Sequence, residues 1–61
     1  MKLLKKTAVC EMVSYSKAHI DRLEVAGLFP KRIRLGQGRV AWVEDEVISW
    51  IKQRILERDS Q

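Results

Sequence analysis

The stretch that decides the fold covers residues 17–30 and reads K-A-H-I-D-R-L-E-V-A-G-L-F-P. On a helix, Ile20, Leu23 and the small Gly27 fall on one face. The opposite face carries Ala18, Asp21, Arg22 and Val25. Gly27 can adopt the left-handed backbone conformation that closes a helix, and Pro30 prevents the helix from continuing. The stretch therefore predicts a helix of about ten residues that ends at Gly27.

The residues before this helix predict a shorter helix and a tight turn. Thr7 is the expected N-cap, and apolar residues follow it at helical spacing: Ala8, Val9, Met12 and Val13. Ser14, Tyr15 and Ser16 then interrupt the pattern, and Ser16 is the expected N-cap of the next helix. Two helices separated by only about three residues cross at a steep angle. This is helix-turn-helix geometry.

After Pro30 the pattern changes from helical spacing to alternation. Arg32, Ile33, Arg34 and Leu35 alternate charged with apolar, Gly36, Gln37 and Gly38 break the pattern, and R-V-A-W-V follows at residues 39–43. This predicts a β-hairpin. We expect the inward side chains to be Ile33, Leu35, Val40 and Trp42, and the outward ones to be Arg32, Arg34 and Arg39. Such a hairpin beside a helix-turn-helix is a wing.

A third helix is expected from the acids at its start, Glu44, Asp45 and Glu46, and from the apolar spacing of Val47, Ile48, Trp50, Ile51 and Ile55. Residues 59–61 are expected to be a frayed end. Cys10, Trp42 and Trp50 are expected in the core. The predicted fold is mainly α with a small β-hairpin, a winged helix-turn-helix of order α-α-β-β-α, as one domain over residues 1–61.

The charge distribution indicates a polyanionic partner. The 61 residues contain 12 Lys and Arg and 8 Asp and Glu, a net charge of +4. Residues 31–43 alone carry a net charge of +4 with no acid, which places the positive field in the middle of the chain. The apolar runs are too short for a membrane span or a secretion signal. A cytoplasmic protein without membrane contact is expected.

The residue inventory argues against an enzyme. Cys10 and His19 are the single cysteine and histidine of the sequence, too few for a metal site or a nucleophilic pair. The tip at residues 36–38 is too short to cradle a phosphate group, and the consecutive acids at 44–46 diverge around a helix. No metal, cofactor or small-molecule ligand is expected.

Duplex DNA is the polyanion that the predicted elements fit best, because an exposed helix and a basic wing suit the major groove and the flanking phosphates. Lys17 and Arg22 are the main candidates on the second helix. His19 is interpreted equally well as a phosphate donor or as a partly packed side chain. The wing candidates are Lys31, Arg32, Arg34 and Arg39. Trp42 and Trp50 are interpreted as core residues rather than as platforms for bases.

Three segments carry a resemblance to a known family: I-D-R-L-E-V-A-G-L-F-P at residues 20–30, R-I-R-L at 32–35, and R-V-A-W-V-E-D-E-V-I-S-W-I at 39–51. They resemble the AlpA-like phage regulators, which are grouped with small excisionases among MerR-like winged-helix proteins. The resemblance covers about residues 4–55. It implies a sequence-specific duplex DNA-binding protein of a prophage, acting as a transcriptional regulator, as an excisionase that turns an integrase toward excision, or as both.

The resemblance also implies where the DNA lies, with the second helix in the major groove and the hairpin along the backbone or minor groove. The matching positions are Ser16, Lys17, Arg22, Arg34 and Arg39. An integrase and cooperating copies of the chain on DNA are candidate partners, and the nucleoid is the expected location. The chain departs from the family where Ser14 stands at the usual glycine of the turn and where residues 17–21 begin the second helix.

Two choices stay open at this point. Nothing in the residues separates a regulator from an excisionase, or an activator from a repressor. The alternative from another class is a protein-interaction module, in which the third helix or residues 54–61 dock an integrase or a polymerase subunit without specific DNA binding.

Overall fold

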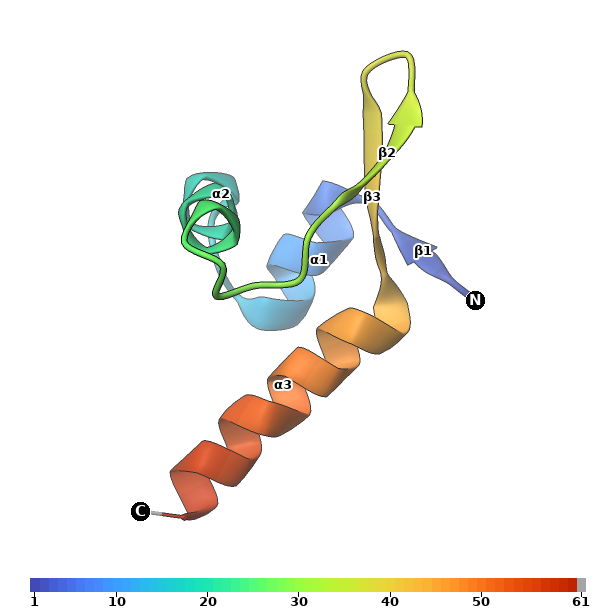
Figure 1. Ribbon diagram of the computed structural model, residues 1–61. Coiled ribbons are helices and arrows are strands. Elements are labelled where there is room, and N and C mark those ends of the chain that lie inside the picture. The colour runs from blue at the N-terminus through green and yellow to red at the C-terminus, as the bar shows by residue number, and fades with distance from the viewer. Residues whose placement is uncertain (61) are drawn as a thin grey trace.

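The computed structural model describes residues 1–60, and within them the chain forms three helices and three short strands (Figure 1). The elements in order are β1 (Leu3–Leu4), α1 (Lys6–Val13), α2 (Lys17–Val25), β2 (Ile33–Gly36), β3 (Arg39–Val43) and α3 (Glu44–Asp59). The expected winged helix-turn-helix order is confirmed, with β1 added at the start. None of the helices in the described residues is long and apolar enough to cross a membrane.

The strands form one antiparallel sheet in the order β1-β3-β2. Leu3 pairs with Val43 and Leu4 with Trp42, and the Glu44 amide donates to the Lys2 carbonyl at 2.8 Å. β1 was not among the sequence predictions, because a two-residue strand is too short to show an alternating pattern. Its pairing joins the start of the chain to the base of the hairpin.

The first helix begins earlier than the sequence predicts. Lys6 is the first helical residue, Lys5 occupies the N-cap without a side-chain cap bond, and the Val9 amide donates to the Lys5 carbonyl at 3.0 Å. The prediction of Thr7 as the N-cap was therefore wrong. Since Leu4 is held in the sheet by Trp42, the helix starts directly after the strand and places Thr7 inside its first turn.

The turn and the second helix follow the prediction closely. Ser14 caps α1 in the left-handed conformation, with φ 61°. The Ser16 hydroxyl accepts from the His19 amide at 3.2 Å, which confirms Ser16 as the N-cap of α2. α2 ends at Val25, and Gly27 has φ 76°.

The core takes residues from all three helices and from β1 and β3. Its buried residues are Leu4, Val9, Ile20, Phe29, Trp42 and Val47. The Trp42 indole N–H donates to the Pro30 carbonyl at 3.1 Å, and that of Trp50 donates to the Leu28 carbonyl at 2.8 Å, so both hold the segment after α2. Trp42 is fully buried, whereas Trp50 and Cys10 are half-buried at the edge of the core.

α3 is longer than the core requires and runs away from the sheet (Figure 1). Its first turn holds the three predicted acids, and Val47 is its buried residue. The helix continues to Asp59, where the sequence predicts a frayed end, and the Ser60 amide and hydroxyl both donate to the Leu56 carbonyl, at 3.0 and 2.8 Å. Gln61, the last residue of the expected frayed end, lies outside the described residues.

Candidate nucleic-acid interface

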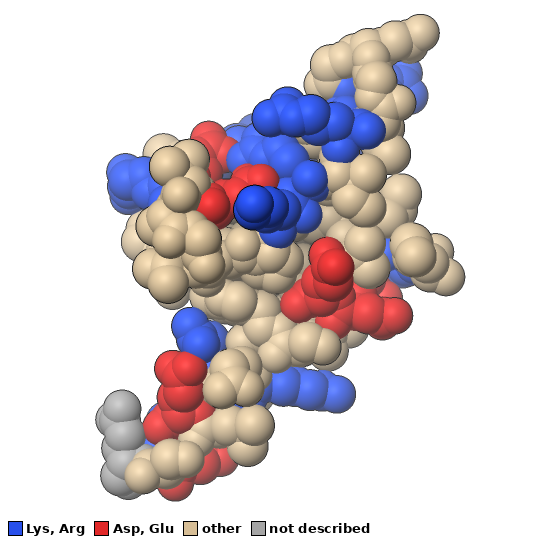
Figure 2. Space-filling view, viewed as in Figure 1, with Lys and Arg blue, Asp and Glu red and all other residues tan. Residues whose placement is uncertain are grey.

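Positive side chains gather around α2 and the base of the hairpin, with carboxylates between them, while a separate acidic group covers the start of α3 (Figure 2). α2 and the hairpin border a shared hollow. Its lining residues are Asp21, Glu24, Val25, Lys31, Arg32 and Arg34. Three of the four predicted wing cations therefore face the same hollow as α2.

The outward face of α2 is exposed along its length. Lys17, Ala18 and Arg22 are exposed, and Val25 at the end of the helix is 90% exposed. Ala18, Arg22 and Val25 lie three or four residues apart, so they form one stripe. The stripe combines small, apolar and cationic side chains, as a helix that enters a groove requires.

His19 lies beside this stripe rather than on it. Its ring is half-buried and packs against Tyr15, with 4.2 Å between ring centroids. Arg22 Nη2 lies 3.3 Å from His19 Nδ1, so the guanidinium donates to the ring when the imidazole proton is on Nε2. Of the two interpretations of His19, the packed one matches these contacts. With that tautomer, the same contact joins the Arg22 guanidinium to the His19 ring.

The side chains of β2 and β3 do not share faces of the sheet in the way that the sequence predicts. Ile33 pairs with Ala41 and Arg34 with Val40, and an irregularity lies between Arg34 and Gly36. Arg34 therefore shares a face with Val40, and Leu35 is 52% exposed. Val40 and Trp42 lie toward the core as expected, but the prediction was wrong for Ile33 and Leu35. The relative phase of two strands depends on the turn and not on the alternation within each strand.

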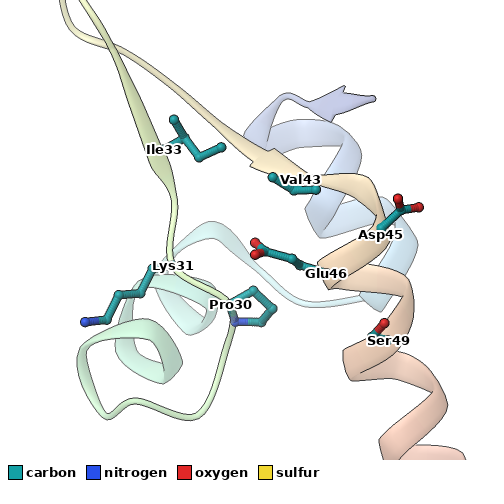
Figure 3. Close-up of a pocket in the computed structure, with 7 residues that line it drawn as sticks. All are labelled: Pro30, Lys31, Ile33, Val43, Asp45, Glu46 and Ser49. Carbon is teal, nitrogen blue, oxygen red and sulfur yellow. The ribbon is translucent and has the colours of Figure 1, made fainter. Parts of the chain in front are cut away.

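The remaining wing cations occupy different surroundings. Arg34 and Arg39 are exposed, as expected. Arg39 lies by a separate hollow that Lys5 also lines, away from the hollow beside α2. Lys31 lines a further hollow with Asp45 and Glu46, but its side chain extends away from both carboxylates (Figure 3). Lys31 thus remains free of the acidic start of α3.

Arg32 does not point outward, and that prediction was wrong. Its side chain is 20% exposed, and its guanidinium lies over the Trp42 ring at 4.9 Å from the centroid. Arg32 Nε donates to Glu24 Oε1 at 2.7 Å, and its Nη2 donates to Asp21 Oδ1 at 2.6 Å. The pairing of β2 with β3 explains this orientation. It places Arg32 on the same face of the sheet as Trp42, toward the two carboxylates of α2.

Lys6, Asp21, Glu24 and Arg32 form one ion cluster, which we call the Arg32 cluster. Lys6 Nζ donates to Asp21 Oδ1 at 2.7 Å, so the cluster joins α1, α2 and the residue before β2. The hydrogen bonds from Lys6 and then Arg32 hold the pKa of Asp21 below its usual value. Burial raises the pKa of Glu24, but hydrogen bonds from Arg32 outweigh it and leave that pKa lowered. Hydrogen bonds to Glu24 and then Asp21 raise the pKa of Arg32.

The formal charges of the cluster cancel, since it contains two cations and two carboxylates. The acids of α2 that face the hollow are therefore neutralised by neighbours from the chain itself. Asp21 Oδ1 accepts from both Lys6 and Arg32. In residues 1–60 no group of three or more His, Cys, Asp or Glu is placed to hold a metal ion.

Sequence reasoning missed two features of this surface. Val25 was placed on the outward face but not counted as a site residue, although an apolar β-branched side chain at an outward position was a usable signal. Glu24 was not recognised as the partner of Arg32. No local signal could have found that pair, because the two residues lie eight positions apart on different elements.

A helix-turn-helix whose second helix lies exposed beside a sheet with a projecting hairpin defines a winged helix-turn-helix protein. The family model for the prophage CP4-57 regulatory protein AlpA matches residues 2–55. The chain therefore belongs to the AlpA family, which is a family of regulatory DNA-binding proteins and not of enzymes. The resemblance stated from the sequence is confirmed. No curated protein matches the chain.

Proposed function

We propose that the protein binds a specific duplex DNA sequence and regulates transcription in a prophage or integrated element. In this proposal α2 enters the major groove and the hairpin contacts the backbone or the minor groove. The observation that carries the proposal is the surface formed by α2 and the hairpin. The exposed stripe of α2 reaches the shared hollow at Val25, and Lys31 and Arg34 line the same hollow from the hairpin side. Membership of the AlpA family supports it independently.

The side chains of α2 that we propose to contact DNA differ in the group of the DNA that each can bind. Arg22 offers a planar fork to a guanine edge or a phosphate, and Lys17 offers an ammonium group close to the N-terminus of the helix. The Ser16 hydroxyl accepts a cap bond and keeps its proton free to donate to a phosphate. His19 acts by holding Arg22 in position. Val25 offers methyl groups to the C5-methyl of a thymine.

The proposed contacts on the wing are phosphate contacts by Lys31, Arg34 and Arg39. Arg32 is assigned no direct DNA contact, because its guanidinium is engaged with Asp21, Glu24 and Trp42. Regulation and excision would use the same contacts and differ in where the DNA site lies, at a promoter or at an attachment site. An integrase and further copies of the chain remain proposed partners, and the nucleoid the proposed location.

One observation favours the alternative of protein docking. α1, Tyr15 and α3 border an apolar hollow with an arginine rim, lined by Met12, Val13, Tyr15, Trp50, Ile51, Arg54, Ile55 and Arg58. Ile55 in this lining is 42% exposed, and the neighbouring Leu56 is 60% exposed. A helix that presents such residues could receive a protein partner.

Two variants of equal charge separate these functions. Arg34→Ala with Arg39→Ala removes two wing cations, and Arg54→Ala with Arg58→Ala removes two cations from α3. We expect the wing variant to weaken binding to a duplex selected from a random pool by at least about a hundredfold, and to reduce the salt dependence of log K by about two. The α3 variant should bind as the wild type does. Fluorescence anisotropy across a salt series measures both quantities, and equal losses for both variants would contradict the proposal.

A further inference from the structure

We infer that Arg32 is a positioning residue, which holds the wing at a fixed spacing from α2 and shields the carboxylates of α2 from DNA. This inference rests on the proposed function of duplex binding. It assigns a role to a cationic residue of the wing whose side chain is mostly enclosed.

The contacts of Arg32 come from both DNA-binding elements. On the α2 side, Arg32 uses its backbone N–H as well as its side chain, because the amide donates to Glu24 Oε2 at 2.9 Å while Nε donates to Glu24 Oε1 at 2.7 Å. On the hairpin side, the guanidinium stacks over the Trp42 ring of β3. Glu24 is also well enclosed, with its side chain 14% exposed.

The spacing between α2 and the wing needs such a link. β1, β2, α1 and α3 all pack closely on β3, whereas α2 does not approach β2 or β3 over a comparable length of backbone. The relative position of α2 and the hairpin therefore depends on α1, which packs on both α2 and β3, and on the side chains between α2 and the hairpin. Arg34 is only two residues from Arg32, so fixing the Arg32 backbone also fixes where the Arg34 side chain leaves the strand.

The same contacts determine the charge that DNA would meet. Asp21 and Glu24 line the hollow between α2 and the wing, together with Lys31 and Arg34. Without Arg32, one of the two cations that neutralise these acids would be lost. A phosphate near the hollow would then be repelled at short range. Arg32 thus allows two acidic residues on the proposed recognition helix without a cost to DNA binding.

The test separates positioning from direct contact and from a loss of stability. The cluster variant combines Arg32→Gln, Glu24→Gln and Asp21→Asn, so it removes the link without exposing carboxylates, and Arg34→Gln is the control for a lost phosphate contact. The probe is a duplex that the wild type selects from a random pool. Affinity, salt dependence and the hydroxyl-radical footprint are measured for each protein, and thermal unfolding confirms that each is folded at the assay temperature.

For the cluster variant we expect at least a tenfold loss of affinity, with protection lost where the wing lies and retained where α2 lies. Arg34→Gln should keep the footprint and reduce the salt dependence of log K by about one. If the cluster variant does not fold, Arg32→Lys takes its place, since lysine keeps the charge but has neither the fork nor the planar face. The same selective loss of wing protection is expected for it.

Two results would overturn the inference. One is a cluster variant, or Arg32→Lys, with wild-type affinity and a complete footprint. The other is a uniform loss of protection over both parts of the site in proportion to a lower melting temperature, which would make the cluster a source of stability alone. Failure of the wild type to select any duplex would instead overturn the proposed function.

Discussion

At the residue scale, Val25 is the most exposed large apolar side chain of the helices in residues 1–60, at 90%. An outward valine at the end of α2 contributes nothing to the core, but its methyl groups suit a thymine C5-methyl. Replacing single thymidines of the selected duplex by deoxyuridine deletes one methyl group at a time. At one position we expect a loss of about 0.8 kcal/mol, roughly fourfold in Kd, in the wild type. Val25→Ala should lose this sensitivity.

The control for this prediction is Leu56→Ala. Leu56 is an apolar residue of α3 that is 60% exposed, and its loss should leave the sensitivity to deoxyuridine unchanged. If Val25→Ala distinguishes thymidine from deoxyuridine as well as the wild type does, Val25 does not contact a thymine methyl.

Ser14 allows a second prediction at this scale. It holds a left-handed conformation, with φ 61°, which costs a residue with a Cβ about 1 kcal/mol relative to glycine. Ser14→Gly should therefore raise the free energy of unfolding by up to about 1 kcal/mol in urea titration. Ser49→Gly, at an exposed site inside α3, should lower it by about 0.5 to 1 kcal/mol. A lower stability for Ser14→Gly would show that the turn does not carry this strain.

At the scale of elements, the Arg32 cluster makes the joining of α1, α2 and the hairpin base sensitive to acid. The pKa values of Asp21 and Glu24 are lowered in the folded protein from ordinary values of 3.8 and 4.5. Near and below these values the unfolded chain binds more protons than the folded one, so stability falls as pH falls. The cluster contributes fully at neutral pH and is lost as pH decreases below about 4.5.

Glu24→Gln tests this prediction. At pH 7 the variant should be less stable than the wild type by on the order of 2 kcal/mol, since hydrogen bonds to a charged group are lost. At pH 3 the difference should shrink, because the Glu24 carboxylate of the unfolded wild type is then protonated, which favours unfolding. Urea unfolding at both pH values measures the difference, and a constant gap between the two proteins would rule out titration of Glu24 as the cause.

The sequence could predict the helix limits that are marked by capping, helix-ending or acidic residues at those limits. Ser16, Gly27 and Pro30 mark the limits of α2, and the acids at residues 44–46 mark the start of α3. The features it could not predict depend on contacts distant in sequence. β1 exists because Leu4 pairs with Trp42, and the inward position of Arg32 follows from the hairpin phase and from acids eight and eleven residues earlier. The outward orientation of Arg34 and Arg39 was predicted, whereas the hollow that Arg34 shares with α2 was not.

At the scale of the whole molecule, the described chain is elongated, with extents of 43 × 25 × 19 Å, because α3 runs beyond the core. The proposed DNA surface lies on α2 and the hairpin, and the apolar hollow lies between α1 and α3. A single module of this size buries only about 600 to 1,000 Å² of protein surface on DNA. Tight binding to DNA would therefore be favoured by several copies on adjacent sites or by a second protein on the same DNA.

The most direct test of the central claim is the affinity of the whole chain for a duplex that contains the attachment site and upstream promoters of its element, compared with a scrambled duplex across a salt series. We expect the native duplex to bind more tightly by over about a thousandfold, as specific DNA-binding proteins typically do. A steep salt dependence alone would show only phosphate contacts. Equal, weak binding of both duplexes that disappears near physiological salt would contradict the claim.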